Sequence, residues 1–192
     1  DDIVISAGST TGTVSFTPTD DSIYDATSNE TATIDISGVS GGSATEDGTQ
    51  NVTITITDDD AQPTVSVSST ATGLESVANP DVTVSLSAAS GRDVSVLYGS
   101  TGGTATGSAN AGTDDYQTFT GQTLTISAGT TSNTFSFNVN NDLLDEVDET
   151  IIYSISDPTN AALGVATQTY TIQDDDNQPT FGFAAATSVI DE

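Results

Sequence analysis

Hydrophobic and polar residues alternate along most of this chain, in short runs separated by turn residues. Residues 64–70 read TVSVSST, 133–140 read NTFSFNVN and 166–173 read ATQTYTIQ. A period of two places apolar side chains on one face of a strand and polar side chains on the other. The pattern therefore predicts half-buried β-strands, and these runs have no helical period.

The strands predicted within 64–176 follow from this alternation and from the Gly, Pro and Asn residues between the runs. We place them at 64–70, 81–88, 93–98, 122–128, 133–140, 150–156 and 166–173. Short strands at this density, roughly seven in about 110 residues, are typical of an immunoglobulin-like sandwich. We therefore predict an all-β fold, an immunoglobulin-like antiparallel β-sandwich with almost no helix.

The sequence also repeats itself at long range. Residues 58–69, DDDAQPTVSVSS, return at 174–185 as DDDNQPTFGFAA. Further upstream, ISAGSTTGTVSF at 5–16 returns at 126–137 as ISAGTTSNTFSF. Self-similarity over such a distance indicates tandem repeats of one structural unit.

These matches predict three parts of unequal completeness. We expect the C-terminal part of one repeat at 1–60, a complete repeat at 64–176 and the first strand of a following repeat at 180–192. The linkers AQP and NQP are short and contain Pro, which favours stiff end-to-end stacking. Because the incomplete first part would expose sheet edges, we expect preceding chain or a partner subunit of a polymer to complete it.

The charge of the chain is extreme. It has 28 Asp and Glu residues, one basic residue (Arg92) and no His, for a formal net charge of −27. Such a chain repels nucleic acid and anionic membrane surfaces and attracts cations. No stretch approaches the roughly 18 apolar residues of a membrane span. We therefore expect no nucleic-acid partner and no membrane insertion.

Missing residue types narrow the chemistry further. The chain has no Cys, which excludes disulfides and thiolate metal sites. Without His, Cys or Lys, the usual nucleophile–base pairs of enzymes are unavailable, and the paired carboxylates coincide with the metal pattern described below, so we expect no enzymatic activity. The chain opens on Asp1 and Asp2, the wrong start for a signal peptide. We therefore expect a mature fragment or part of a longer protein.

The acidic residues of 64–176 fall in alternate connections between the predicted strands. If neighbouring strands run antiparallel, every second connection lies at the same end of the sandwich. The connections at that end contain Glu75, the pair Asp114 and Asp115, the cluster NNDLLDEVDE at 140–149, and Asp174–Asp176. The sequence thus predicts that four acidic groups, far apart along the chain, converge at one end.

A metal ion would neutralise these groups, because the sequence offers almost no Lys or Arg. Zinc and copper would lack their preferred His and Cys donors. Calcium takes 6–8 oxygen ligands in flexible geometry, whereas magnesium, which prefers a tighter octahedron, fits less well. We therefore predict bound Ca²⁺, with more than one ion in so dense a cluster. The alternative is that the acids only solvate the surface, as in a halophilic protein; however, the outward-facing strand positions are mostly uncharged, Asp35 being an exception.

The stretch 64–176 resembles a Calx-β domain, the calcium-binding sandwich of sodium–calcium exchangers and of many bacterial surface proteins. Five features carry the resemblance: Glu75 after the first strand, GTATG…DDY at 103–116, LTISAGTTSNTFSF at 124–137, NDLLDEVDETIIYSI at 141–155 and the closing IQDDD at 172–176. Together they cover nearly the whole predicted repeat.

The resemblance implies a set of calcium ligands. In the complete repeat they are Glu75, Asp115, Asp142, Glu146, Glu149, Asp174, Asp175 and Asp176, and the neighbouring acids Asp114, Asp145 and Asp148 are further candidates. Asn141 stands where the family commonly has an Asp, so one ion is expected to bind more weakly or to be missing. In the partial repeat the candidates are Asp21, Asp25, Glu30, Asp58, Asp59 and Asp60, although the insertion ATSN lengthens the loop before Glu30.

These observations predict a structural function. We expect a calcium-rigidified segment of a long extracellular bacterial surface adhesin, stalk or filament, whose partners are neighbouring repeats of the same chain or polymer. One alternative is a calcium-sensing regulatory module, as in the exchangers. Another is an adhesive module that binds surface glycans or host proteins through its strand faces.

Overall fold

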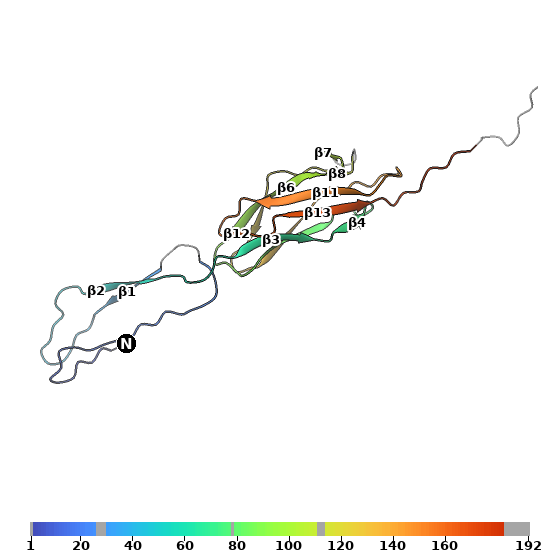
Figure 1. Ribbon diagram of the computed structural model, residues 1–192. Helices are drawn as coiled ribbons and strands as arrows, with labels where there is room; N and C mark the ends of the chain where they lie inside the picture. Colours follow the sequence, from blue (N-terminus) through green and yellow to red (C-terminus); the bar gives the residue numbers. More distant parts are fainter. Residues whose placement is uncertain (1, 26–29, 78, 111–113, 183–192) are drawn as a thin grey trace, which may run out of the picture. The chain divides into compact units, whose positions relative to one another are not determined.

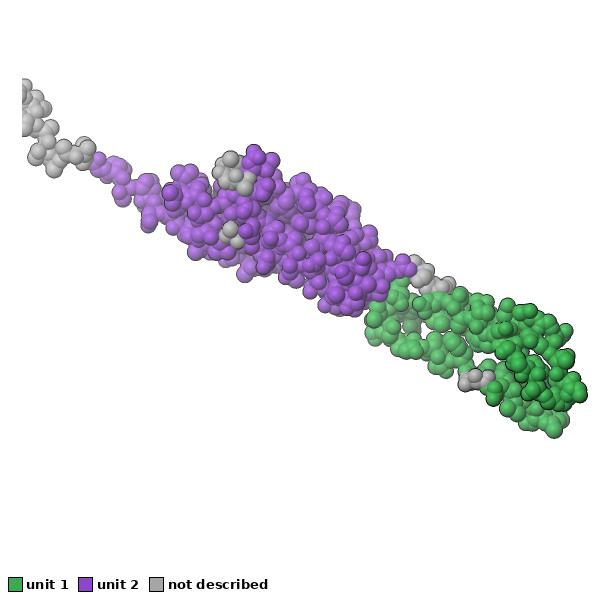
Figure 2. Space-filling view, turned by 180° about the vertical axis from the view of Figure 1, so that it is seen from behind, with its two compact units in different colours: residues 1–61 green, residues 62–192 purple. Residues whose placement is uncertain are grey.

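The computed structural model describes residues 2–25, 30–77, 79–110 and 114–182 (Figure 1). The chain divides into two compact units, Asp1–Ala61 (unit 1) and Gln62–Glu192 (unit 2), coloured in Figure 2. The boundary falls within the predicted linker AQP. Most of the predicted third part, 183–192, lies outside the described residues. No helix in the described residues is long and apolar enough to cross a membrane.

Unit 2 is a sandwich of two β-sheets. Its strands are β3 (Thr64–Ser69), β4 (Thr72–Leu74), β5 (Asp81–Leu86), β6 (Val94–Gly103), β7 (Gly107–Ser108), β8 (Tyr116–Gln117), β9 (Gln122–Ile126), β10 (Ser132–Ser136), β11 (Glu149–Ser156), β12 (Ala162–Leu163) and β13 (Thr167–Gln173). One sheet has the order β10-β5-β3-β12 and the other β4-β13-β11-β6-β9, while β7 and β8 form a small separate pair. The prediction of an all-β sandwich is confirmed, and each of the seven predicted strands has a counterpart.

The first predicted strand, 64–70, is present as β3, which ends at Ser69 and pairs with β5. Beyond its predicted end, Thr72–Leu74 form an additional strand, β4, which lies in the other sheet and runs parallel to the end of β13. The backbone N–H of Thr171 donates to the carbonyl of Ala71, and that of Glu75 donates to the carbonyl of Gln173, both at 2.9 Å. This second pairing holds Glu75 beside the last residues of β13.

The third predicted strand is longer than expected, because β6 continues to Gly103 through a register shift opposite Ile152 and Tyr153. Gly103 has a φ of +128°, and a Cβ at this position would lie 1.9 Å from the carbonyl oxygen of Thr150. Only glycine fits there. The N–H of Ala105 donates to the same Thr150 carbonyl at 3.0 Å, so the chain remains beside β11 just after β6 ends.

The core of unit 2 lies between the two sheets and follows the predicted alternation. Val65 and Val84 from one sheet and Ile126, Ile151 and Tyr153 from the other are at most 1% exposed. Aromatic rings extend the core toward the end where the acidic connections lie: Phe137 packs against Tyr153 and Tyr170, with ring centroids 5.6 and 5.5 Å apart. Close packing of these side chains fixes the position of one sheet relative to the other, and the strand ends in turn fix where each loop begins and ends.

Unit 1 contains a single hairpin in its described residues. Strand β1 (Glu30–Asp35) pairs antiparallel with β2 (Asn51–Ile56), in a register that joins Glu30 to Ile56 and Asp35 to Asn51. Elsewhere in unit 1, large apolar side chains are exposed to solvent: Ile5 is 56% exposed and Phe16 is 44% exposed. Unit 1 is therefore open on the face that a second sheet covers in unit 2.

Candidate metal centre

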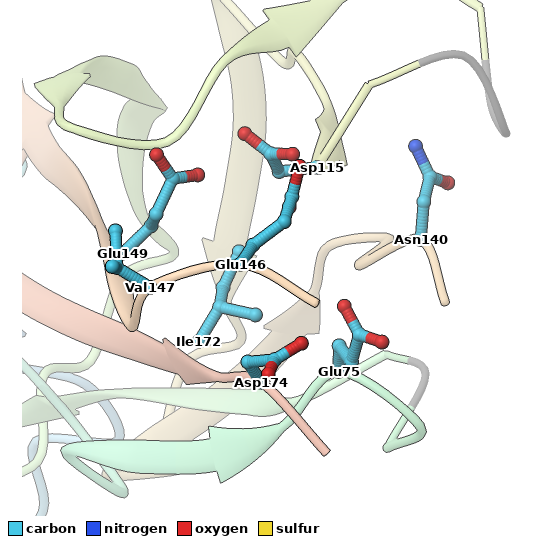
Figure 3. A pocket seen from close by; sticks show the side chains of 8 residues that line it. All are labelled: Glu75, Asp115, Asn140, Glu146, Val147, Glu149, Ile172 and Asp174. Carbon is cyan, nitrogen blue, oxygen red and sulfur yellow. The ribbon is translucent and has the colours of Figure 1, made fainter. Parts of the chain in front are cut away.

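Four connections of unit 2 meet at one end of the sandwich, which we call the acidic pole. They are residues 75–80 after β4, 104–121 after β6, 137–148 after β10, and 174–176 after β13. A pocket at this pole is lined by residues from all four connections and from the adjoining ends of β11 and β13: Glu75, Asp115, Asn140, Glu146, Val147, Glu149, Ile172 and Asp174 (Figure 3). The structure thus brings together acids that are about a hundred residues apart along the chain.

Backbone hydrogen bonds tie these connections to one another. The N–H of Asp115 donates to the carbonyl of Thr106 at 3.0 Å, and one carboxylate oxygen of Asp115 accepts the N–H of Thr106. The N–H of Asn140 donates to the carbonyl of Asp115 at 2.9 Å. The N–H of Asp174 donates to the Asp148 carboxylate at 3.3 Å. These hydrogen bonds, within and between the connections, therefore fix the positions of the carboxylates.

Six acids form two groups of three within the pole. Glu75, Asp142 and Asp176 each place one carboxylate oxygen within 4.8 Å of the others, and so do Asp115, Glu146 and Glu149. Figure 3 shows Asp115 and Glu146 pointing toward one another from two different connections, with Glu75 next to Asp174. Asp174 lines the same pocket, and after burial and other neighbouring carboxylates it contributes to the raised pKa of both Glu75 and Glu146. It therefore lies close to both groups.

Three buried carboxylate oxygens at this pole have no hydrogen-bond donor: Glu75 Oε1, Asp174 Oδ1 and Asp176 Oδ2. Glu75 itself is only 6% exposed. A buried carboxylate without a donor or a positive partner is costly, and such groups are rare in folded proteins. These atoms therefore point to a partner that is positively charged.

The electrostatics of the pole agree with this interpretation. Burial, followed by the neighbouring Asp176 carboxylate, raises the pKa of Glu75 from 4.5 to about 7. Burial, followed by Asp115, raises the pKa of Glu149 to about 7 as well. The pKa of Glu146 is raised for similar reasons. Each shift means that the folded chain disfavours the charged form unless a cation lies nearby.

The donor set fits a hard divalent cation. Every side-chain donor in both groups is a carboxylate oxygen, and the sequence contains no His or Cys. Oxygen-only sites suit calcium or magnesium rather than zinc or copper. The three unpartnered buried oxygens are ligand atoms that such an ion would bind.

The remaining predicted ligands of unit 2 lie at the pole but outside both groups. Asp175 is exposed and accepts the hydroxyl of Ser76 at 2.7 Å. Asp148 accepts the Asp174 N–H, Asp145 is exposed, and the carbonyl of Asp114 accepts the side-chain amide of Asn140. These four acids contribute charge and loop structure to the pole.

Two asparagines complete the description of the pole. Asn141, which stands where the resemblance leads one to expect an Asp, is exposed, and its amide donates to the carbonyl of Asp142. Asn140 lines the pocket instead, and sequence reasoning missed it. Asn140 directly follows Val139, the last buried apolar residue of the alternating run 133–140, and this position could have indicated that it lies at the pole.

The candidate ligands of unit 1 lie together, and most of them are exposed. Asp21, Asp25, Glu30, Asp58, Asp59 and Asp60 all line a second pocket. The Asp25 N–H donates to Asp58 at 3.0 Å, and burial together with Asp58 and Asp59 raises the pKa of Asp60. Among the described residues of unit 1, no three carboxylates come as close together as in unit 2.

Comparison with known proteins places the fold and its acidic pole in context. The family model of the Calx-beta domain matches residues 58–176. This chain belongs to the Calx-beta domain family. The match begins at the first Asp triplet and ends at the second, so it covers all of the strands and all four acidic connections of unit 2. Among curated proteins, none matches the chain.

Solved Calx-beta structures share the sandwich. The apo-form Calx CBD1 domain is 24% identical, with a TM-score of 0.51, and the similarity covers 59% of this chain and 99% of that domain. CBD12 from CALX1.2 is 25% identical with the same TM-score, and this chain spans 44% of its length. The Calx CBD2 domain is 14% identical, with a TM-score of 0.50 over 58% of this chain and 86% of that domain. These similarities confirm the Calx-β type of sandwich.

Proposed function

We propose that unit 2 binds calcium at the acidic pole and acts as a calcium-rigidified structural repeat of an extracellular bacterial surface adhesin, stalk or filament. The observation that carries the proposal is the set of buried, unpartnered oxygens of Glu75, Asp174 and Asp176. They come from two connections that the sequence separates by about a hundred residues. Membership of the Calx-beta domain family supports calcium as the ion.

Each group of carboxylates would hold part of the metal load. Glu75, Asp142 and Asp176 form one set of ligands, and Asp115, Glu146 and Glu149 form the other, with Asp174 near both. A bound cation supplies the positive charge that these carboxylates lack. The residues themselves join four connections, so neutralising them removes the repulsion that would push the loops apart.

Rigidity follows from linkage between binding and folding. A ligand that binds only the folded state stabilises it by about 2.7 kcal/mol at a concentration one hundred times its dissociation constant. Since Asp174–Asp176 lead directly into the linker NQP, the ordered pole also restrains the start of that linker. Short linkers with Pro favour stiff stacking of successive repeats, and the repeated segments of the sequence support such stacking.

The calcium affinity would distinguish an extracellular repeat from a calcium sensor. An extracellular module works at dissociation constants of about 10⁻⁴–10⁻³ M, whereas a sensor responds at about 10⁻⁷–10⁻⁵ M. We expect the weaker range, because the ligands are spread over exposed loops and Asn141 replaces an acid. Calorimetric titration of the chelator-treated chain with Ca²⁺ measures this directly, and a micromolar or tighter constant would favour the sensor.

A matched pair of variants separates specific binding from general acidity. Asp176→Asn removes a ligand from the pole, whereas Asp35→Asn removes an exposed acid of β1 that belongs to neither group. We expect the first variant to lose calcium affinity and the second to bind as the original chain does. Equal behaviour of the two, or no calorimetric response to Ca²⁺ in the original chain, contradicts the proposal.

A further inference from the structure

One short strand delivers Glu75 to the acidic pole. β4 contains only Thr72, Gly73 and Leu74, and its one sheet neighbour in the described part of the chain is β13 (Figure 1). Glu75 follows directly, 6% exposed, with one buried carboxylate oxygen that no donor reaches. Burial of this charge is unfavourable, and a three-residue edge strand has few hydrogen bonds to oppose it. The side-chain contacts of β4 therefore decide whether Glu75 stays in place.

Gly73 packs against the hydroxyl of Tyr170. Alternation along β4 turns Gly73 inward, to the same face as Glu75, whereas Thr72 and Leu74 are exposed. A Cβ on Gly73 would lie 2.0 Å from the hydroxyl oxygen of Tyr170 and 3.2 Å from Cζ of its ring. The backbone of β4 thus approaches the end of this tyrosine more closely than any residue with a Cβ would permit.

Tyr170 has little room to move away from Gly73. Its side chain is 2% exposed, and its ring packs edge-on against Phe137, with the ring centroids 5.5 Å apart. Its backbone lies in β13, opposite Ile151 of β11, and β13 is enclosed between β11 and β4. Close packing on all these sides fixes the hydroxyl in space. The hydroxyl of Tyr170 therefore sets how closely β4 can approach the core.

A second tyrosine holds the chain where it crosses from one sheet to the other. β3 ends at Ser69, whose hydroxyl forms a hydrogen bond with that of Tyr153 on β11. The Ser69 hydroxyl also donates to the carbonyl of Thr70 at 2.9 Å. Because a serine hydroxyl has one proton to donate, Tyr153 is the donor of the first bond. The crossing is thus attached to the second sheet at both ends, by Tyr153 at Ser69 and by Tyr170 at Gly73.

We propose that Gly73 and Tyr170 are positioning residues for the calcium ligand Glu75. Their close contact sets the distance of β4 from the core, and this distance places the Glu75 carboxylate beside the other two members of its group. The inference rests on the proposed function, because it names the residues that build one of the two ligand groups. We call them the first group, Glu75, Asp142 and Asp176, and the second group, Asp115, Glu146 and Glu149. β4 carries no member of the second group, which should not depend on the contact.

The test compares Ca²⁺ binding by variants of the full chain in calorimetric titration. Gly73→Ala adds one methyl group against the hydroxyl of Tyr170 and leaves every carboxylate in the chain. We expect the first group to bind Ca²⁺ about 10–100-fold more weakly, the range typical when a residue that orients a metal ligand is changed. The second group should keep its affinity. Asp176→Asn and Glu149→Gln identify which binding step belongs to which group.

Rescue distinguishes this contact from a general loss of stability. Tyr170→Phe removes the hydroxyl that the new methyl group meets, so Gly73→Ala combined with Tyr170→Phe should recover most of the lost affinity. Tyr170→Phe alone should change the affinity little. The matched control is Gly164→Ala beside β3 in the other sheet, where a Cβ would lie 2.4 Å from the hydroxyl oxygen of Ser66. This control should lower the unfolding temperature without weakening either group.

A measurement without metal examines the position of β4 directly. The N–H of Glu75 donates to the carbonyl of Gln173 at 2.9 Å, so its hydrogen exchange reports on the pairing of β4 with β13. In EDTA, Gly73→Ala should speed the exchange of this amide, measured by nuclear magnetic resonance, more than that of the amides in β5. Addition of Tyr170→Phe should slow it again.

A second pair of substitutions covers the case in which Gly73→Ala does not fold. Ser69→Ala with Tyr153→Phe removes both partners of the buried hydrogen bond at the other end of the crossing and adds no atom, a change that costs little stability. We expect a smaller loss of Ca²⁺ affinity than Gly73→Ala causes, again confined to the first group. Unchanged affinity in this double variant would contradict the role of the crossing.

The outcomes separate this inference from the proposed function. If Gly73→Ala binds Ca²⁺ as the original chain does, the positioning contact is wrong and the calcium-binding repeat stands. If Tyr170→Phe fails to rescue it, or if Gly164→Ala weakens the first group equally, the loss reflects general instability and the positioning contact is again wrong. If the original chain binds no Ca²⁺, both the proposed function and this inference are wrong.

Discussion

Units 1 and 2 contain the same sequence pattern in two different environments. Ile5 and Phe16 of unit 1 correspond in the repeat to Ile126 and Phe137 of unit 2. The first pair is 56% and 44% exposed, whereas the second pair is 1% and 4% exposed. Nothing in the local sequence separates them. In unit 2 these two residues belong to the core between two sheets, whereas the described residues of unit 1 form only the hairpin β1–β2.

The acids differ between the units in the same way. In unit 2, β4 pairs with β13 and carries Glu75 into the pole, where three carboxylate oxygens become buried without a donor. In the described part of unit 1, no strand lies beside β2 on the side away from β1, and Asp21, Asp58 and Asp59 remain exposed. Closure of the sandwich thus converts an acidic surface into a candidate metal centre.

The largest contrast should appear in the cores. Phe137→Ala removes a ring packed against Phe119, Tyr153 and Tyr170, and we expect it to cost unit 2 about 3–5 kcal/mol of unfolding free energy. Phe16→Ala should cost unit 1 less than about 1 kcal/mol, because that side chain is already half exposed. Urea unfolding followed by hydrogen exchange in each unit measures both. Similar costs would show that unit 1 has a closed core after all.

Calcium should distinguish the units next. At a Ca²⁺ concentration one hundred times the dissociation constant, we expect the unfolding temperature of unit 2 to rise by about 10 °C. Hydrogen exchange of β2 in unit 1 should change little, because its acids lie further apart. Scanning calorimetry with and without EDTA, with Mg²⁺ as the control ion, checks the first statement. If Ca²⁺ slowed hydrogen exchange equally in both units, the expected difference in calcium binding between them would be wrong.

A matched substitution should have opposite effects on binding and on stability. Glu75→Gln removes a buried, unpartnered charge, so we expect calcium affinity to fall by about tenfold while the unfolding temperature in EDTA rises. Glu30→Gln, at the exposed start of β1, should change neither quantity noticeably. Calorimetric titration and thermal unfolding of both variants provide the measurements. A loss of stability of the Glu75 variant in EDTA would contradict the assignment of an unpaired charge.

The smallest effect is the response of the metal-free chain to pH. Glu75 and Glu149 have a pKa of about 7 in the folded unit, against an ordinary value of 4.5. The folded state therefore holds more protons than the unfolded state between these values, so stability falls as pH rises from about 4.5 to 7. Urea unfolding in EDTA at pH 5 and at pH 7.5 should show this loss in unit 2.

Calcium should reverse that slope. Binding needs deprotonated carboxylates, so calcium affinity increases through the same pH range. In saturating Ca²⁺ we therefore expect unit 2 to be at least as stable at pH 7.5 as at pH 5. A metal-free chain whose stability rises with pH across this range would show that these glutamates lie in water.

The strands could be predicted from the sequence because alternation reports directly on a half-buried strand. The short strand β4, Thr72–Leu74, could not. Nothing in Thr70 or Ala71 marks the crossing, which depends on the free edge of β13 in the other sheet. The extension of β6 to Gly103 likewise depends on the carbonyl of Thr150, a contact across the sheet that local sequence does not contain.

The acidic pole was predictable as a meeting place but not in its details. Antiparallel order alone places the four connections at one end. Which triplet members turn inward follows from continued alternation after the buried Ile172: Asp174 and Asp176 have buried oxygens, and Asp175 is exposed. The grouping of Asp142 with Glu75 depends on the path of the connection 137–148, which follows no period.

The parallel pairing of β4 with β13 has a mechanical consequence. Thr72–Leu74 lie beside Thr171–Gln173 in the same direction, joined at both ends by hydrogen bonds from Thr171 to Ala71 and from Glu75 to Gln173. Tension applied between the two ends of unit 2 would act along these strands and shear all their bonds at once, rather than opening them one after another. The edge that delivers Glu75 to the pole therefore also serves as a clamp against extension.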